Sequence, residues 1–455
     1  MSTEVPTMNH NDFDLPDVPL GPEFDGIDRV LRVGGVNRDA VIAHFGEFNA
    51  VHDDIDLMVV GVGPEEMLDR GFSLIDAEST QSVFHDSRGR EVALPRAEQS
   101  TGAGYHDFDM KVLPAEVPAE VPAEEAIRRD LERRDLTINA IATDVRTGEV
   151  FDPFNGVQDA RDGVIRHVSE AFRDDPLRVV RAARYTARFD FEIHPDTEAL
   201  MRETAPKMDA LPGDRFGTEL VKALKQAREP RRFFDVLDRV DALDVAFPEL
   251  AALKGVPAGP DHAHREGDSL EHTLRVLTEL HDRRGNDVPA LLAAVVHDVG
   301  KAKTPDSTLP SHPRHHTLGK PIAVEMRKRL GLSRDLRGVG TFATREHMKL
   351  HDIEELRATT LLDAAKAISE SPLSPEQAAD LQAADALGRE PAGGVKAGQV
   401  VERIQAAQAV IEEIDGAAVM DSRGWEPADI GTEISGENFG NVVRQDRAEA
   451  LRARL

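Results

Sequence analysis

The apolar runs that indicate strands in this 455-residue chain lie almost entirely before about residue 160. Val30–Val33 and Ile55–Val60 are strong strand candidates, and Val92–Leu94 and Phe108–Val112 are weaker ones. Asn37–Phe45, between the first two, has helical character. Beyond about residue 160, apolar residues recur at helical spacing and strand signals nearly vanish. The pattern predicts an α+β protein, with a mixed α/β head followed by helical units.

The length suits about three domains of ~150 residues, and composition divides the chain further. Residues 1–28 combine acidic residues with prolines and hold no Lys or Arg, which indicates a disordered extension. The repeat PAEVPAEVPAEE at 114–125 indicates a loop because of its prolines. We expect an extension at 1–28, the head at 29–160, a helical neck and body at 161–260, a His-rich helical unit at 261–395 and a helical tail at 396–455.

Acidic residues outnumber basic residues by 83 to 55, which gives a formal net charge of −28. Lys supplies only 12 of the 55 basic residues. Acid-rich, lysine-poor chains suit concentrated salt, because screening over a few ångströms cancels their self-repulsion. We therefore hypothesise a halophilic host. Taken alone, this acidity argues against a nucleic-acid partner, so such a partner must be recognised by local features.

Cysteine is absent, which excludes disulfides, cysteine zinc sites and thiol nucleophiles. Any metal must therefore be bound by His, Asp or Glu. No apolar stretch approaches the ~18 residues of a membrane span, and the first residues lack the pattern of a secretory signal. These features predict a cytoplasmic protein without a membrane partner, and they leave the oligomeric state open.

The first chemical constellation combines a glycine turn with two carboxylates. Gly34 and Gly35 end the first strand and precede a helix, so backbone N–H groups there can approach a triphosphate closely. Asp54 and Asp56 are two residues apart at the start of a strand and point to the same face. Two such carboxylates favour Mg²⁺, which can hold the attacking and leaving oxygens of a phosphoryl transfer. Arg38 could balance phosphate charge. Each feature alone is more often structural, but this order of features is rare by chance.

The sequence resembles the polymerase-beta type of nucleotidyltransferase head, and further motifs narrow the resemblance. RRDLTINA, DPFNG and RHVSEAFRDDPLRVVRAARYTARF look like successive motifs of class II tRNA nucleotidyltransferases, the CCA-adding enzymes. The resemblance implies template-independent addition of the 3′-terminal CCA to tRNA from CTP and ATP. It also implies that Asp54 and Asp56 bind the catalytic Mg²⁺ ions, with Glu91 as a third carboxylate.

The same resemblance assigns roles to residues further along the chain. It implies that Arg134 contacts the nucleotide, that Asp175 and Arg178 bond to the base edge, and that Arg181 and Arg184 hold the triphosphate. Residues 161–188 carry seven Arg against four acidic residues. The alternative is a solvated basic stripe, but its position after the head motifs favours a phosphate-facing role.

Two departures from the family pattern affect fine specificity more than the type of reaction. The turn commonly written GGAVRD reads GGVNRD here, with Asn37 in place of an apolar residue. The motif often written EDxxR begins with Asp174 instead of Glu.

The second constellation consists of histidines. His297 and Asp298 follow the apolar run LLAAVV, where only a metal or strong hydrogen bonds would offset the burial of polar groups. The segments HTLRVL, VVHDVGK, RHHTLG, REHMKLH and AADALGR resemble the ordered motifs of an HD-type metal phosphohydrolase domain. The resemblance implies a divalent metal, of undetermined identity, on His272, His297, Asp298 and Asp385. His315, His316 and His347 could complete the site.

This fusion resembles bacterial CCA-adding enzymes that also have phosphatase and 2′,3′-cyclic phosphodiesterase activity. One alternative is a poly(A) polymerase-like RNA adenylyltransferase, which shares the head motifs. Another is an HD phosphohydrolase with an inactive head, and a protein that only shields RNA ends is a third. The intact carboxylate and arginine motifs favour the CCA-adding interpretation.

Overall fold

The computed structural model describes residues 13–46, 48, 55–75, 83–100, 108–112, 122–336, 338–427, 430 and 434–455. The predicted catalytic residue Asp54 lies outside the described residues, as do 1–12 and most of the 114–125 repeat. The chain divides into two compact units, which we describe separately. Unit 1 comprises Met1–Leu211 with Arg239–Ala242, and unit 2 comprises Pro212–Asp238 with Leu243–Leu455.

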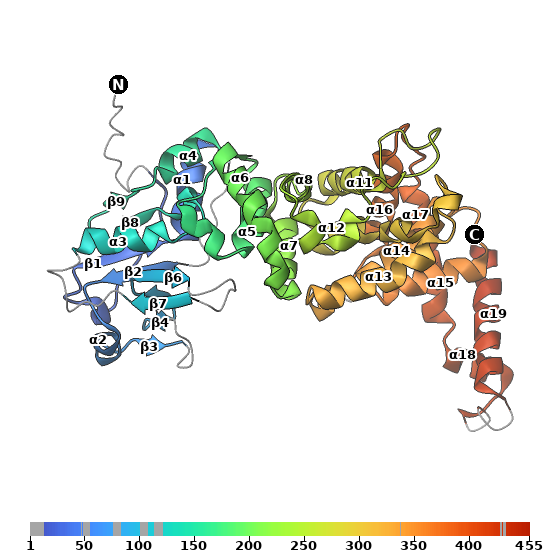
Figure 1. Ribbon diagram of the computed structural model, residues 1–455. Coiled ribbons are helices and arrows are strands. Elements are labelled where there is room, and N and C mark those ends of the chain that lie inside the picture. The colour runs from blue at the N-terminus through green and yellow to red at the C-terminus, as the bar shows by residue number, and fades with distance from the viewer. Residues whose placement is uncertain are drawn as a thin grey trace. The chain divides into compact units, whose positions relative to one another are not determined.

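Unit 1 is built on a seven-stranded sheet with the order β3-β4-β5-β2-β1-β8-β9 (Figure 1). β1 is antiparallel to both β2 and β8, whereas β2 and β5 are parallel. β6 and β7 form a separate antiparallel pair. The strands are β1 (Arg29–Val33), β2 (Asp56–Val60), β3 (Ser73–Leu74), β4 (Val83–His85), β5 (Glu91–Ala93), β6 (Arg96–Ser100), β7 (Phe108–Val112), β8 (Ala142–Asp144) and β9 (Val150–Phe151).

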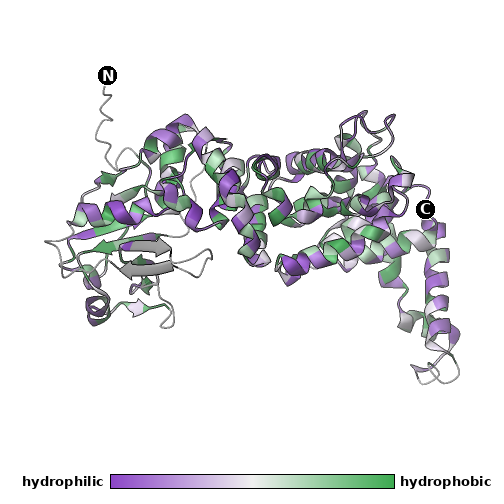
Figure 2. Ribbon diagram, viewed as in Figure 1, coloured by the Kyte–Doolittle hydropathy of each residue, from purple (hydrophilic) through white to green (hydrophobic). Residues whose placement is uncertain are grey.

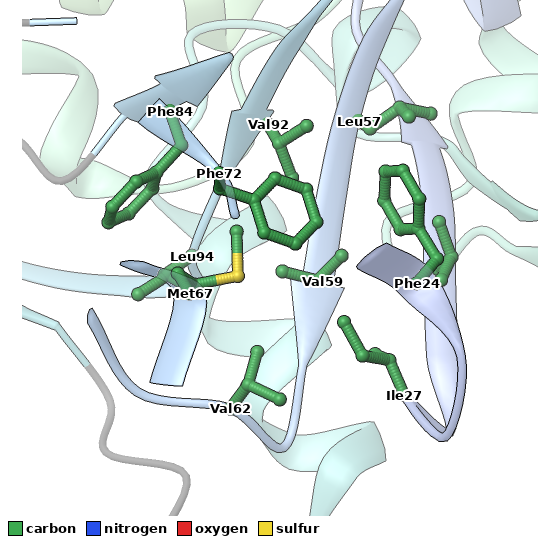
Figure 3. Packing of buried hydrophobic residues seen from close by; sticks show 11 residues of the cluster. Phe24, Ile27, Leu57, Val59, Val62, Met67, Phe72, Phe84, Val92 and Leu94 are labelled. Atoms are coloured by element: carbon green, nitrogen blue, oxygen red, sulfur yellow. The ribbon is translucent and has the colours of Figure 1, made fainter. Parts of the chain in front are cut away.

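Both faces of this sheet are buried. Leu57 and Val59 of β2 pack with Phe24 and Phe72 on one face (Figure 3). Met58 and its alternate neighbours pack on the other face, in a cluster that includes α3 (Ala123–Glu132). Burial on both sides explains why β2 is apolar at four consecutive positions rather than at alternate ones. Each face loses its core if the register of β2 slips by one residue.

The predicted disordered extension is wrong for residues 13–28. Phe24 and Ile27 are fully buried in the sheet's core, and Leu20 packs against the same cluster. Glu23 accepts hydrogen bonds from the backbone and side chain of Ser87. The prediction relied on the acidic and proline-rich composition of the segment and overlooked a few apolar residues that cover the sheet. Its prolines are compatible with an extended backbone.

The helices of unit 1 confirm the expected mixed head. α3 begins at Ala123, so the last three residues of the 114–125 repeat are helical and the loop prediction fails there. A two-residue parallel pair, β10 and β11, interrupts the region predicted to be wholly helical. The other elements are α1 (Gly35–Phe45), α2 (Pro64–Asp69), α4 (Gly156–Asp162), β10 (Val164–Ile165), α5 (Leu177–Phe189), β11 (Glu192–Ile193) and α6 (Pro195–Thr204).

Unit 2 is helical, and α12 is apolar along its whole length (Figure 2). α8 ends at Arg239, at the boundary of the units. The helices are α7 (Gly213–Gln226), α8 (Arg231–Arg239), α9 (Leu243–Ala246), α10 (Pro248–Ala251), α11 (Ser269–Arg284), α12 (Val288–Val296), α13 (His315–Arg329), α14 (Val339–His351), α15 (Ala358–Ser369), α16 (Pro375–Gly388), α17 (Ala397–Glu413), α18 (Gly416–Arg423) and α19 (Gly436–Arg454).

Two glycines bring the polar elements of unit 2 together. A Cβ on Gly300, in the 3₁₀ turn Val299–Lys303, would collide with the carbonyl oxygen of His315. A Cβ on Gly319 of α13 would lie 3.1 Å from the Thr344 side chain of α14. Because both positions lack a side chain, the turn after α12 packs directly against α13, and α13 packs closely against α14.

Candidate functional sites

The glycine turn of unit 1, Gly34–Gly35, lies next to Asp56, one of the predicted metal ligands. Gly34 has a φ of +78°, and a Cβ there would lie 3.0 Å from Oδ2 of Asp56. Gly35 is the first residue of α1, and a Cβ on it would lie 3.4 Å from the guanidinium of Arg38. The turn therefore leaves space around the Asp56 carboxylate that any larger residue at position 34 would fill. Asp54, its predicted partner, lies outside the described residues.

Strand register places the third predicted carboxylate beside Asp56. Leu57 of β2 is paired with Val92 of β5 in a parallel ladder, so Asp56 and Glu91 are neighbours at the start of the two strands. Leu57 and Val92 share one apolar cluster, which puts Asp56 and Glu91 on the opposite face together. Glu91 is exposed. The arrangement fits the sequence-based expectation of a carboxylate group at this end of the sheet.

Arg38 is buried and joins α1 to α5. Its Nε donates to Oδ1 of Asp39 at 2.7 Å, and its Nη1 donates to Asn139 Oδ1 at 2.9 Å and to the Tyr185 hydroxyl at 3.0 Å. Its guanidinium also lies 4.8 Å from the centre of the Tyr185 ring. The glycine turn and the arginine helix are therefore connected by one hydrogen-bonded network.

The departure from the family turn is also accommodated. The Nδ2 of Asn37 donates to the carbonyl oxygens of Arg32, at 2.6 Å, and Ile141, at 3.1 Å. The polar side chain thus ties the end of β1 to the segment before β8.

The arginine row of α5 is not a solvated stripe. Arg178, Arg184 and Arg188 are at most 9% exposed. Arg181 Nε donates to Asp135 Oδ2 at 2.7 Å, and Arg188 Nη2 donates to Asp39 Oδ2 at the same distance. These paired contacts hold the row in place inside the unit.

The other two arginines of the row make contacts of a different kind. Arg178 donates to the carbonyl oxygens of Ala171 and Arg133, at 2.8 and 2.6 Å. The guanidinium of Arg184 lies 4.0 Å from the centre of the Tyr185 ring. Both contacts fix the plane of a guanidinium.

Tyr185, which sequence reasoning missed, reports the charge of this region. Burial alone raises its pKa, but the nearby Arg38, Arg184 and Arg181 lower the pKa to about 7. At this hydroxyl the three arginines outweigh both burial and the nearby Asp135, which indicates a positive potential around Tyr185. An anion would be attracted to this part of unit 1.

The two remaining predicted nucleotide-binding residues lie in the same unit. Arg134 Nη2 contacts Asp130 Oδ2 and its Nη1 donates to the carbonyl of Asn139, both at 3.3 Å. Asp175 Oδ1 accepts from the backbone N–H of Leu177 at 3.0 Å, at the start of α5. The carboxylate of Asp175 thus fixes the beginning of the arginine helix.

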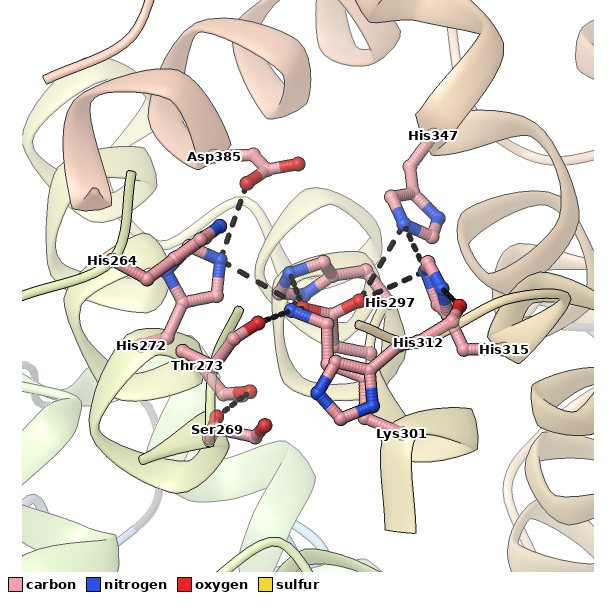
Figure 4. A network of polar contacts seen from close by, with 12 residues as sticks. His264, Ser269, His272, Thr273, His297, Lys301, His312, His315, His347 and Asp385 are labelled. Carbon is pink, nitrogen blue, oxygen red and sulfur yellow. Dashed lines mark hydrogen bonds and ion pairs between the residues drawn. The ribbon is translucent and has the colours of Figure 1, made fainter. Parts of the chain in front are cut away.

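The histidine constellation of unit 2 surrounds one carboxylate (Figure 4). Oδ2 of Asp298 lies 3.2 Å from His297 Nε2 and 3.7 Å from His272 Nε2. Oδ1 lies 3.4 Å from His315 Nε2 and 3.5 Å from His347 Nε2. All five residues are buried. Each oxygen of Asp298 therefore faces a separate pair of imidazoles.

Backbone carbonyls orient three of these rings. Nδ1 of His297, His315 and His347 contacts a carbonyl oxygen three or four residues earlier, at 2.7, 2.8 and 2.6 Å, on Ala294, His312 and Ala343. With Nδ1 donating, each Nε2 presents a lone pair to the centre. His297 Nε2 and Asp298 Oδ1 have no hydrogen-bond partner among the described residues. Converging lone pairs with unsatisfied buried atoms fit a bound divalent cation.

Asp385 completes the predicted ligand set. Its Oδ1 lies 3.2 Å from His272 Nε2, and its Oδ2 lies 2.6 Å from His351 Nε2. Arg389 Nη2 donates to Oδ1 at 3.1 Å. Burial raises the pKa of Asp385, but Arg389 and His351 hold it well below its usual range.

Lys301 plays the corresponding part for Asp298. Its ammonium lies 2.6 Å from Oδ2 of that carboxylate. Burial raises the pKa of Asp298, and Lys301 with His297 lowers it well below the usual range. Both predicted carboxylate ligands are therefore held as anions.

The structure separates the three additional histidines of the prediction. His315 and His347 belong to a donor group with Asp298. His316 is half-buried and belongs to none of the donor groups formed by the described residues. A further group, which sequence reasoning missed, contains His264 and Glu266 with His272. The H-x-E spacing just before α11 was its available signal.

Comparison with known proteins agrees with this division of the chain. Residues 30–166 match the "Poly A polymerase head domain", 190–254 match the "Probable RNA and SrmB-binding site of polymerase A", and 269–390 match the "HD domain". The multifunctional CCA protein of Alkalilimnicola ehrlichii is 38% identical over 339 residues, covering 73% of this chain and 77% of the relative. That of Burkholderia mallei is 35% identical over 415 residues, covering 88% and 95%.

The chain belongs to the multifunctional CCA protein family. Two solved structures share the fold of this family member. The Thermotoga maritima CCA-adding enzyme complexed with tRNA has a TM-score of 0.55 at 20% identity, with 95% of this chain and 89% of that chain covered. The Bacillus stearothermophilus CCA-adding enzyme in complex with CTP has a TM-score of 0.57 at 18% identity, with 96% and 94% covered.

Several predictions about this chain are thereby confirmed. The resemblance to CCA-adding enzymes, the α+β class and the nucleotidyltransferase identity with a fused HD domain all hold at the level of the family. Within the described ranges, none of the helices combines the length and apolar character that crossing a bilayer requires. Individual site residues remain predictions.

Proposed function

We propose that this chain is a template-independent CTP/ATP:tRNA nucleotidyltransferase that adds or repairs the 3′-terminal CCA of tRNA. The observation that carries the proposal is the bond from Arg38, in the first turn of α1, to Tyr185 of α5. It joins the glycine turn beside Asp56 to the buried arginine row. A carboxylate for metal and an excess of guanidinium groups for a triphosphate therefore belong to one site.

The chain's own residues would share the work as follows. Arg38, Arg181 and Arg184 neutralise the triphosphate and hold it with its α-phosphate toward Asp56. Asp54, Asp56 and Glu91 would hold Mg²⁺, which supplies Lewis-acid activation of the tRNA 3′-hydroxyl and of the phosphate oxygens when bound. The space that Gly34 leaves beside Asp56 supports this assignment.

Base selection would fall to Asp175 and Arg178, with Arg134 against the nucleotide. The two carbonyl contacts of Arg178 fix its guanidinium plane, and a fixed plane is what reading a base edge requires. A carboxylate and a guanidinium together offer an acceptor and donors. A mismatched base would leave buried polar groups unpaired, which explains selection of C and A without a template.

Labelled CTP and ATP with a tRNA that lacks CCA test this proposal. Asp56→Asn should lower addition on the order of 10³-fold or more, because it removes a metal ligand. Glu149→Gln is the matched control, because Glu149 lies in the same unit and its side chain pairs with Arg29, and neither residue belongs to the proposed site. Incorporation of ATP alone, with no use of CTP, would instead indicate the poly(A) polymerase alternative.

For unit 2 we propose a metal-dependent phosphatase and 2′,3′-cyclic phosphodiesterase. His272, His297, Asp298 and Asp385 would hold a divalent cation, with His315 and His347 available for a second. A cation held there supplies an activated water and charge neutralisation for attack on a phosphoester. His351 and Arg389 are the more exposed groups beside Asp385 and would donate hydrogen bonds to the phosphoester.

This second activity has its own test. His297→Ala should abolish hydrolysis of a 2′,3′-cyclic nucleotide and leave CCA addition unchanged. Asp56→Asn should show the reverse pattern. Loss of both activities in either variant would contradict the assignment of one activity to each unit.

A further inference from the structure

His272 is oriented differently from the other histidines of the metal centre. The Nδ1 atoms of His297, His315 and His347 contact backbone carbonyls. Nδ1 of His272 instead lies 3.1 Å from Oε1 of Glu266, which is within ion-pair distance. The orientation of this contact falls outside hydrogen-bond geometry, so among the described residues the buried Nδ1 has a carboxylate beside it but no hydrogen-bond partner.

Glu266 is itself held firmly. Its side chain is 0% exposed, and its Oε1 lies 2.6 Å from Nδ1 of His264. Its Oε2 accepts the backbone N–H of Glu390 at 2.9 Å, so the segment after α16 also fixes it. Both oxygens of this carboxylate are therefore held in place by neighbouring residues.

A fixed carboxylate behind a histidine has a specific effect on metal binding. A histidine that binds a cation through Nε2 must carry its proton on Nδ1, and the acceptor of that proton sets the ring's orientation. A carboxylate also makes the imidazole a stronger donor than a carbonyl does. Nε2 of His272 faces Asp385 and Asp298, at 3.2 and 3.7 Å, on the side away from Glu266.

We propose that Glu266, held by His264, is the positioning residue of His272 and strengthens cation binding on the His272 side of the centre. The proposal rests on the metal centre proposed for unit 2. It makes the centre asymmetric: one imidazole is supported by a carboxylate, and the His315–His347 side is supported only by backbone carbonyls. A separate cation on His264 and Glu266 is the competing use of the same donor group.

Metal titration of the full chain tests the proposal. Mn²⁺, Co²⁺, Ni²⁺ and Zn²⁺ are titrated separately into metal-free protein by calorimetry, and the ion lost in His272→Ala defines the His272 side. Glu266→Ala should weaken that ion by about 10–100-fold, and Glu266→Gln should weaken it less, because one amide oxygen can still face Nδ1. The ion lost in His315→Ala should keep its affinity. Where the wild type binds one ion, the comparison is made on that ion.

Matched variants separate positioning from folding. Asp287→Asn removes a carboxylate at the opposite end of α12, where it caps the helix, and should leave every affinity unchanged. Thermal unfolding of the metal-free proteins identifies a variant that fails to fold, and Glu266→Gln then decides the question alone.

The outcomes distinguish the two levels of the argument. Unchanged affinity in both Glu266 variants overturns the positioning role while the metal centre stands. Equal weakening on both sides of the centre also overturns it, because that is the result of a general structural loss. An additional ion that His264→Ala removes would establish the competing site. A wild type that binds none of the four ions overturns the metal centre and this proposal together.

Discussion

The two units bury charge in opposite ways. In unit 1 the arginines of α5 find partners within the protein: Arg181 with Asp135 and Arg188 with Asp39, each at 2.7 Å. In unit 2, Asp298 is surrounded by imidazole nitrogens, and its Oδ1 has no hydrogen-bond partner among the described residues. The arginines of the first site are thus paired with carboxylates of the protein, whereas the buried donors of the second converge on one another as a candidate cation site.

This difference predicts how each unit responds to divalent ions. A cation at 100 times its dissociation constant stabilises the folded state by about 2.7 kcal/mol. We expect this stabilisation in unit 2, because its buried histidine and carboxylate atoms converge on a candidate cation site. The arginine network of unit 1 should keep its structure without any added ion.

The largest expected effect follows from removing the central carboxylate of unit 2. Asp298→Asn removes the carboxylate that pairs with the Lys301 ammonium and leaves it the carbonyl of Ala258 as an acceptor. Breaking such a buried pair is expected to lower the free energy of unfolding by about 3–5 kcal/mol. The variant should also lose stabilisation by divalent ions. Denaturant unfolding with metal and with chelator measures both effects.

A surface carboxylate of the same unit provides the control. Asp446→Asn, on α19, removes the partner of Arg423 on α18. Its free energy of unfolding should change by less than about 1 kcal/mol. If Asp298→Asn retained the response to divalent ions, the cation would not be held where we place it.

The second prediction concerns the turn of unit 1. Gly34 and Gly61 both have positive φ, +78° and +87°, so alanine at either position should destabilise the fold by about 1–2 kcal/mol. Only at Gly34 would the new Cβ approach Asp56, since nothing lies within 4 Å of one at Gly61. Gly34→Ala should therefore lower CCA addition by about 10–100-fold, because small displacements of catalytic groups are costly.

Comparing the two variants separates the effect of the new contact with Asp56 from the effect of backbone strain, which both variants share. Addition assays on tRNA lacking CCA, together with denaturant unfolding, provide both quantities. Equal activities in Gly34→Ala and Gly61→Ala would show that the space beside Asp56 is not used.

The sequence was sufficient where local pattern determines structure. The strand predicted at Ile55–Val60 is β2, and the helix predicted at Asn37–Phe45 is α1 with two more residues at its start. Glycine turns and apolar runs are local signals, and each HD motif contains its own candidate donors. These parts of the fold, and the residues that form candidate donor groups in unit 2, were therefore accessible without a structure.

Contacts between distant residues were not accessible in the same way. Arg188 bonds to Asp39, 149 positions earlier. The sequence therefore could not show that members of the arginine row are paired with carboxylates inside the protein. Glu266 precedes α11 as one acid among many and is recognised only when the ring of His272 lies beside it. In a chain with 83 acidic residues, composition does not indicate which carboxylates are buried.

The third prediction uses Tyr185 to measure the charge that the arginines leave unbalanced. The chain has two tyrosines, so Tyr105→Phe leaves Tyr185 as the only one. Absorbance titration of this variant should show ionisation near pH 7 instead of near 10. Added triphosphate should raise the midpoint, because it neutralises the arginines.

The same group makes stability depend on pH. A folded pKa below the unfolded one means that ionisation stabilises the fold above about pH 10, and this contribution is lost as the pH falls toward about 7. The difference in unfolding free energy between the parent and Tyr185→Phe should therefore grow as the pH rises through this window. A constant difference would contradict an excess of positive charge around Tyr185.

The smallest expected effect is the dependence of tRNA affinity on salt. Each phosphate that a protein neutralises contributes roughly −0.7 to −0.9 to the slope of log affinity against log salt concentration. Arg181 and Arg188 already have Asp135 and Asp39 as counter-ions, so binding should release few solvent ions. We expect a slope no steeper than about −3, and Arg184→Gln should reduce it by less than one further phosphate's share. A steep slope would show that solvated basic groups outside this row bind the tRNA.

The net charge of −28 leads to a matching prediction for folding: added salt should raise the free energy of unfolding, because it screens the repulsion between acidic groups. A free energy of unfolding that does not change with salt would remove the argument for a halophilic host.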